Sequence, residues 1–185
     1  MGKLMDHTSR IVQVEHIRVW TGTPFAEVVR RIEAETGVFA PVAAMRARIE
    51  AKAPSGSVIE DIAAMAGRSG LMRFAALDHG AILRLQGKPT DAIRFLIGHP
   101  LTASRMTKLQ IGSGLYAPLS LLVAADERTG TVLEYDRPST LLEQFEDPGV
   151  AQVARELDEK FAALIDSATA LNIITHTKPE TKGSI

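Results

Sequence analysis

Apolar residues recur at the three- and four-residue spacing of a helix in three stretches of the first third of the chain. These stretches are residues 23–37, 41–51 and 57–67. Thr23 is suited to cap the first helix and Pro24 to begin it, because proline needs no backbone partner there. The break at residues 54–56, Pro-Ser-Gly, separates the other two stretches. We therefore expect one helix followed by a helical hairpin.

A different pattern, of short apolar or alternating runs, predicts the strands. These runs are residues 11–20, 71–77, 92–97, 119–125 and 131–135. In the first run the alternation slips between Val14 and Ile17, which indicates either a bulge or a strand buried on both faces. Residues 81–85 alternate only loosely and fit either a strand or a short helical turn. The last two runs flank a turn and predict a β-hairpin.

Two more helices complete the pattern. One begins at Pro100 and runs to about Leu109, and the last begins at Asp147 and Pro148 and carries a long apolar stripe. The resulting order is β-α-αα-β-(β)-β-α-β-β-α. Hairpins without regular βαβ alternation predict a single α+β domain, with a mostly antiparallel sheet and helices packed on it. We assign the domain to residues 11–170, between a flexible leader, 1–10, and a flexible tail, 171–185.

Composition narrows the function classes. The chain of 185 residues has a formal net charge of −1 and no cysteine. The charge gives no general attraction to nucleic acid or to an anionic membrane. The missing cysteines exclude disulfides and thiolate chemistry, and they are compatible with a cytoplasmic protein. No apolar run approaches about 20 residues, so no membrane span is expected. We expect a cytoplasmic protein without nucleic-acid or membrane partners.

Asp78-His79-Gly80 follows an apolar strand-like run and is the strongest candidate for acid–base chemistry. A carboxylate beside an imidazole orients it and raises its pKa, so Asp78 and His79 are our candidate catalytic residues. Adjacent strand residues point to opposite faces, so the pair requires a turn, which Gly80 permits. The alternative is a structural turn in which Asp78 binds backbone amides.

Gly98-His99-Pro100 places the start of a helix directly after another strand. Free amides at a helix N-terminus favour an anionic group, and Thr102 adds a hydroxyl in the first turn. Gly98, His99 and Thr102 are therefore candidate ligand-binding residues, and the alternative is a plain strand-to-helix turn. Two histidines 20 residues apart lack a paired ligand spacing, so we predict no metal site and name no cofactor.

Tyr116 and Tyr135 are the remaining candidates. Each lies at the end of a predicted strand, where both hydroxyls would reach one edge of the sheet. The alternative is that each ring covers the core with its polar end in water.

Four segments together resemble a known family: residues 74–80, 97–100, 115–123 and 134–138. In this order they resemble the family known as domain of unknown function 302, and residues 23–29 are similar to its first helix. The resemblance implies a compact α+β domain, often oligomeric, with no established activity. Asp78 and His79 match the family pattern, whereas the family usually has Gly-Asn-Pro at residues 98–100. The hairpin at residues 41–67 looks like an insertion relative to the shortest members.

Three functions remain open from the sequence. The first is a homodimer that binds a small polar or anionic ligand near His79, His99 and Tyr116. The second is an enzyme with His79 as its general acid and base. The third is a structural or oligomerisation module without a ligand site, whose interface is the apolar side of the helical hairpin.

Overall fold

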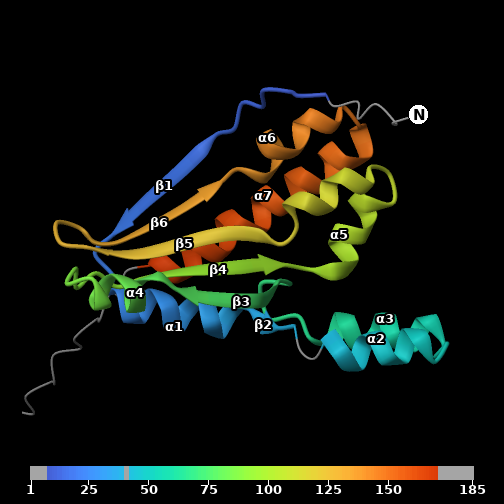
Figure 1. Cartoon of the computed structure of the whole chain (residues 1–185), viewed down its shortest axis with the longest axis horizontal. Helices are drawn as coiled ribbons and strands as arrows, with labels where there is room; N and C mark the ends of the chain where they lie inside the picture. The colour runs from blue at the N-terminus through green and yellow to red at the C-terminus, as the bar shows by residue number, and fades with distance from the viewer. Residues whose placement is uncertain (1–7, 40–41, 171–185) are drawn as a thin grey trace, which may run out of the picture.

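Six strands and several helices make up the part of the chain that the computed structural model describes, residues 8–39 and 42–170. The strands are β1 (His16–Thr21), β2 (Gly37–Val38), β3 (Met72–Asp78), β4 (Ala92–Gly98), β5 (Leu119–Asp126) and β6 (Gly130–Asp136). They form one sheet in the order β1-β6-β5-β4-β3-β2, with every neighbouring pair antiparallel except β2 and β3 (Figure 1). The expected α+β fold with a mostly antiparallel sheet is confirmed.

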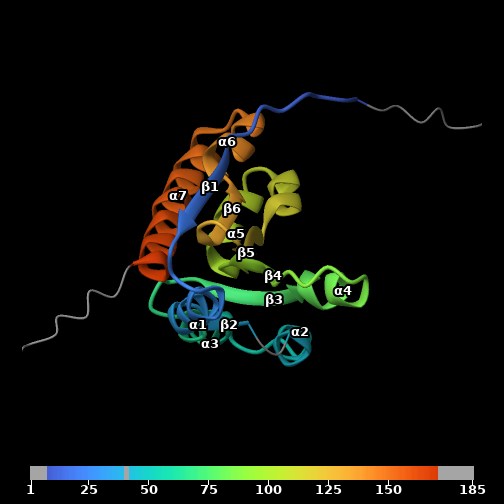
Figure 2. The same ribbon diagram turned by 90° about the vertical axis from the view of Figure 1, so that its left-hand side faces the viewer.

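Helices connect the strands, and α1 and α7 cover one face of this sheet (Figure 2). They are α1 (Phe25–Glu35), α2 (Val42–Glu50), α3 (Ser55–Ala64), α4 (His79–Leu85), α5 (Pro100–Thr107), α6 (Pro138–Leu142) and α7 (Pro148–Thr169), with 3-10 turns η1 (Ile111–Tyr116) and η2 (Glu143–Phe145). α1 and α7 pack side by side against the sheet, and Figure 2 shows the sheet bending around its other, open face.

Strand alternation decides which side chains reach the main core. Phe95 of β4, Leu121 of β5 and Leu133 of β6 point toward α1 and α7 and are completely buried. Phe161 of α7 is also completely buried among them. Burying one such side chain stabilises the fold by roughly 1.5–3 kcal/mol relative to leaving it exposed. The residues between them in sequence therefore project from the open face of the sheet.

The first strand is shorter than the sequence predicts. β1 begins at His16, and residues 11–15 precede it without regular structure. The slip in alternation between Val14 and Ile17 therefore marks the start of the strand, so the expected bulge or doubly buried strand is wrong. A register shift does occur elsewhere in the sheet, between Arg73 and Ala75 of β3.

One open assignment is decided, and one helix start differs from the expectation. Residues 81–85, which fit either a strand or a short helical turn, belong to the short helix α4. α1 starts one residue later than predicted, with Pro24 at its N-cap. The Thr23 hydroxyl instead donates a hydrogen bond to the Thr169 carbonyl at the end of α7, over 3.2 Å. Asp147 caps α7 as expected, accepting bonds from two backbone amides of its first turn.

The α2–α3 hairpin projects from the body beside β2 (Figure 1). It has a small core of its own, in which Met45, Val58 and Ile62 meet Met72 of β3. At the base of the hairpin, the backbone at Gly37 lies close to the backbone at Gly67. The amides of both glycines donate hydrogen bonds to the Leu71 carbonyl. A Cβ at Gly67 would lie 2.3 Å from the Glu35 carbonyl oxygen, so this approach requires glycine.

The two terminal segments are only partly described. Residues 1–7 and 171–185, expected to be flexible, lie outside the described residues. Arg10, at the end of the expected leader, donates to the Gln144 carbonyl and forms an ion pair with Glu146. Within residues 8–39 and 42–170, no helix has both the length and the apolar character needed to cross a bilayer.

Candidate functional site

The two histidine triplets lie at opposite ends of neighbouring strands. β3 and β4 are antiparallel, with Asp78 opposite Ile93 and Gly98 opposite Met72. Ile93 and Gly98 are five residue steps apart along β4, a length of roughly 17 Å at about 3.4 Å per residue. The chain therefore leaves the sheet toward His79 at one end and toward His99 at the other. The expected single site containing both histidines is not formed, because each lines a different hollow.

A cavity of about 110 Å³ lies beside His99, where the end of β4 meets α5, η1 and the start of β5. We call it the His99 cavity. Four of the five predicted ligand-binding residues line it: Gly98, His99, Thr102 and Tyr116. The rest of its wall is mostly apolar and includes Phe74, Met106, Pro118, Leu119 and Leu157. The structure thus brings these four candidates together in a small apolar cavity.

His99 is held in one orientation by the helix that follows it. Its extended backbone makes it the N-cap of α5, and its Nδ1 accepts a hydrogen bond from the Leu101 amide over 3.2 Å. An accepting Nδ1 leaves the proton on Nε2. Burial, with a smaller effect from the Lys160 charge, lowers the pKa of His99 below 6.5. His99 is therefore neutral at pH 7, and it provides a hydrogen-bond donor rather than a positive charge.

The hydroxyls of Tyr116 and Thr102 also belong to residues that line the His99 cavity, and they differ in whether they already form a hydrogen bond. The Tyr116 hydroxyl donates to Oε1 of Gln144 over 3.3 Å, so its proton is already used. The Thr102 hydroxyl makes no side-chain hydrogen bond to any residue that the structure describes. Within the described residues, the Thr102 hydroxyl and the His99 Nε2–H are thus polar groups of lining residues for which the structure shows no hydrogen bond.

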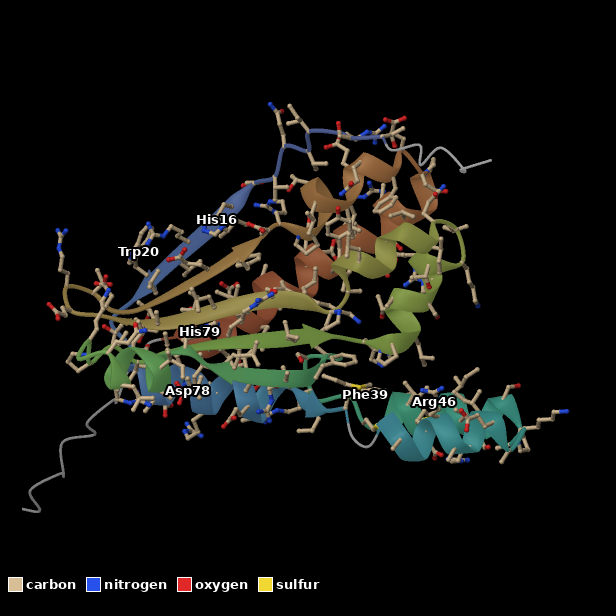
Figure 3. The ribbon with its side chains drawn as sticks, in the orientation of Figure 1. His16, Trp20, Phe39, Arg46, Asp78 and His79 are labelled. Atoms are coloured by element: carbon tan, nitrogen blue, oxygen red, sulfur yellow. The ribbon has the colours of Figure 1, made fainter. Side chains whose placement is uncertain are left out.

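His79 borders a second hollow, on the open face of the sheet. This hollow of about 460 Å³ crosses β4, β5 and β6, with α4 on one side and β1 on the other, and we call it the open-face trough. It is lined by His16, His79, Leu83, Ala92, Arg94, Ser120, Leu122, Glu134, Tyr135 and Asp136. Figure 3 labels His79 at the β3–α4 junction and His16 across the sheet on β1.

Asp78 and His79 do not form the expected acid–base pair. Asp78 is the N-cap of α4, and its Oδ1 accepts a hydrogen bond from the Ala81 amide over 2.8 Å. Its Oδ2 accepts from Arg84 over 3.3 Å. Among the described residues, neither oxygen is hydrogen-bonded to His79. The carboxylate thus ends the strand and caps the helix, as in the alternative of a structural turn.

Tyr135 and Tyr116 lie toward the same end of the sheet, because β5 begins at Leu119 opposite the end of β6, but they border different hollows. The Tyr135 ring packs on Phe161 of α7, with ring centroids 5.7 Å apart. Burial raises the pKa of the Tyr135 hydroxyl above 10. Tyr135 borders the open-face trough, whereas Tyr116 lines the His99 cavity. Its ring therefore covers the core, as the alternative interpretation stated.

Sequence reasoning missed a cluster of charges on the open face. His16 Nδ1 lies 2.8 Å from Asp136 Oδ1, and its Nε2 lies 3.1 Å from Glu134 Oε2. Arg18 pairs with the same Glu134 over 2.9 Å and stacks over Trp20. Hydrogen bonds to Asp136 and Glu134 raise the pKa of His16 above 6.5. Cross-strand register brings these residues together, which no local sequence signal reveals.

No group of three or more potential metal ligands gathers anywhere in the described ranges 8–39 and 42–170. The carboxylates of the open-face trough are hydrogen-bonded to His16 and Arg18 instead. The structure gives no reason to place a metal ion at either hollow.

Comparison with known proteins identifies the family. The model described as "Domain of unknown function DUF302" matches residues 47–168. The chain belongs to the DUF302 family. A crystal structure of a conserved DUF302 protein from Bacillus stearothermophilus has the same fold, with a TM-score of 0.57 and 18% sequence identity. The similarity covers 83% of this chain and 97% of that one. No curated protein matches the chain.

The DUF302 match covers all of the His99 cavity and most of the open-face trough, but not the whole sheet. It begins within α2 and ends in α7, so β1 and α1 precede it. The His99 cavity is built entirely from residues inside the match. The open-face trough also uses His16 of β1, which lies outside it.

Proposed function

We propose that this DUF302 protein binds a small, neutral, mainly apolar molecule in the His99 cavity. The observation that carries the proposal is the convergence of Gly98, His99, Thr102 and Tyr116 on one apolar hollow. Residues of six elements, β3, β4, α5, η1, β5 and α7, line this concave and mostly apolar hollow, as is usual for small-molecule sites. The sequence alone pointed to a polar or anionic ligand, and the neutral state of His99 favours a neutral one.

Size sets the class of ligand. An engineered apolar protein cavity of about 150 Å³ binds benzene. At about 110 Å³, the His99 cavity corresponds in proportion to four or five non-hydrogen atoms, so a small cyclic ketone of six is at its upper limit. The His99 Nε2–H and the Thr102 hydroxyl favour a ligand with one hydrogen-bond acceptor, such as a ketone oxygen.

Titration of the labelled protein with cyclopentanone tests this proposal by backbone-amide NMR, with propionate as the anionic comparison. We expect cyclopentanone to shift amides of α5 and η1 with saturation in the millimolar range, and propionate to shift them at least fivefold less. Ala103→Leu fills the cavity from α5 and removes the shifts. Ala162→Leu, on the exposed side of α7, leaves them unchanged.

Two outcomes would overturn the proposal. One is the absence of saturable shifts at the cavity. The other is unchanged cyclopentanone binding in Ala103→Leu. The alternative of an acid–base enzyme needs an Asp78–His79 contact, and Asp78 is instead bonded to Ala81 and Arg84.

A further inference from the structure

A single row of side chains crosses the open face of the sheet. Strand register aligns Arg18 with Glu134, Glu134 with Leu122, Leu122 with Arg94, and Arg94 with Leu77. These five residues come from β1, β6, β5, β4 and β3, and they point away from α1 and α7. Adjacent strands lie about 4.8 Å apart, so Arg94 lies about 10 Å from Glu134. The positive charge of Arg94 is thus near the middle of the sheet.

Arg94 differs from the other arginines of this sheet. Arg18 and Arg73, and Arg84 beside the sheet on α4, each form an ion pair with a carboxylate. Within the described residues, Arg94 forms no ion pair, and its guanidinium bonds only to the Ser120 hydroxyl, over 2.7 and 3.1 Å. A guanidinium presents five N–H donors in a planar fork that fits a carboxylate. Most of this donor capacity is still available for a ligand.

The surface around Arg94 is apolar. Leu122, Leu83 and Ala92 line the open-face trough with it, and Leu77 on the neighbouring strand has 43% of its surface exposed. Free apolar surface beside an unpaired cation matches a molecule with an acidic head and an apolar tail. Burying the tail contributes about 25 cal/mol for each Å² of apolar surface removed from water.

The walls of the open-face trough restrict the charge of the ligand. His79 lines the same hollow, and its imidazole carries at least one N–H donor in either protonation state. Glu134 and Asp136 form the opposite wall, where Arg18 and His16 already bind them. These acidic groups disfavour a polyanion such as a nucleotide but leave room for a single negative charge at Arg94.

We propose that the open-face trough binds an amphipathic monocarboxylate, with the carboxylate on Arg94 and the apolar tail along Leu122 and Leu83. The site is separate from the His99 cavity, since the two hollows share no lining residue. It differs from that cavity in ligand charge and in size, and residues of β1 and β6 line only the trough.

Titration with octanoate tests the proposal by isothermal calorimetry and amide NMR at pH 7.5 and fixed salt. We expect saturable binding at sub-millimolar concentrations, with shifts in β4, β5 and α4. Acetate, which lacks the tail, and octanol, which lacks the charge, each bind at least tenfold more weakly. Arg94→Gln weakens octanoate binding at least tenfold.

Arg18→Gln is the matched control, because Arg18 projects from the same face but is already paired with Glu134. We expect it to change octanoate binding less than twofold. Equal binding to wild type and Arg94→Gln would overturn the proposal, as would no saturable binding or shifts confined to α5 and η1. A dimer in sedimentation that Arg94→Gln dissociates would also overturn it, because the trough would then be a subunit interface. Cyclopentanone binding in Arg94→Gln reports on the His99 cavity separately, so either proposal can fail alone.

Discussion

At the scale of single residues, the pKa values of two histidines are shifted in opposite directions by their surroundings. His16 lies between two carboxylates on the open face, and these hydrogen bonds favour its charged form. His99 is partly buried near Lys160, and this environment favours its neutral form. The difference follows from burial and neighbours, because both side chains start from the same ordinary pKa of 6.5.

The two histidines therefore contribute to stability with opposite dependence on pH. The folded protein binds the His16 proton more tightly, so this contribution is fully present below pH 6.5 and is lost as pH rises through the folded pKa. The folded protein binds the His99 proton less tightly. Its contribution is present above pH 6.5 and is lost as pH falls through its lowered pKa.

Imidazole NMR resonances followed between pH 4 and 9 measure both values. We expect His16 to titrate above 6.5 and His99 below it. Asp136→Asn removes the largest cause of the His16 shift, so it lowers the His16 pKa and leaves that of His99 unchanged. A His99 pKa above that of His16 would contradict the structure.

The individual site residues also show which parts of a site can be predicted from the sequence. Gly98, His99 and Thr102 were found because a strand-to-helix junction with Pro100 is a local pattern. The Asp78–His79 pair failed for a local reason as well, since the N-cap bond to Ala81 already uses the carboxylate. The cluster around His16 was missed because its partners are about 120 residues away in sequence.

At the scale of elements, the α2–α3 hairpin joins the body through a very close backbone contact. Gly67 has no room for a side chain, since an added Cβ would lie 2.3 to 2.5 Å from backbone atoms of residues 35–37. Gly56, in α3, has nothing within 4 Å of an added Cβ. The two glycines therefore make a matched pair on one hairpin.

We expect opposite effects from alanine at these two positions. Gly67→Ala destabilises the protein by about 1–3 kcal/mol or more, because backbone must move to admit the methyl group. Gly56→Ala is neutral or stabilises by up to about 1 kcal/mol, because alanine favours the helix. Urea unfolding measures both changes. Equal effects of the two substitutions would show that the close approach is absent in solution.

The length and regularity of an element decide how well the sequence predicts it. The β5–β6 hairpin and the stripe of α7 are long, regular patterns, and both occur where expected. β1 was predicted too long, because apolar residues continue before His16 while the pairing with β6 does not. β2 is only two residues long and is defined by its pairing with β3. A pattern of alternating residues cannot be recognised over so short a segment.

At the scale of the whole molecule, two separate clusters of buried residues support the fold. The large one lies between the sheet and α1 with α7, and the small one joins the hairpin to β3. Larger buried clusters cost more free energy to open. The molecule therefore contains one region of high and one of lower local stability.

Native-state hydrogen exchange tests this division. We expect amides of α3 to exchange through local opening, with a lower free energy than amides of β4, β5 and α7, which exchange with global unfolding. The protected amides of β5 serve as the internal reference. Equal protection in α3 and β5 would mean that hairpin and body unfold as one unit.

At this scale the sequence predicts the class of fold and the DUF302 family, both of which are confirmed. It does not predict that the two histidine triplets, at residues 78–80 and 98–100, lie at opposite ends of a strand pair. That depends on β3 and β4 being antiparallel neighbours, a fact of long-range pairing. The dimer and the cytoplasmic location stay predictions.

The contact at Leu71 has a consequence for protein engineering. Gly37 and Gly67 donate to the same carbonyl, so the chain leaves the body and returns to it at nearly one point. Val38 and Phe39, between these residues, pair with Arg73 of β3, so the exchangeable segment begins after Phe39. This junction is therefore a natural place to exchange the hairpin for a reporter domain or a short linker, provided that the new segment also covers Met72 and Phe74, which the hairpin now contacts.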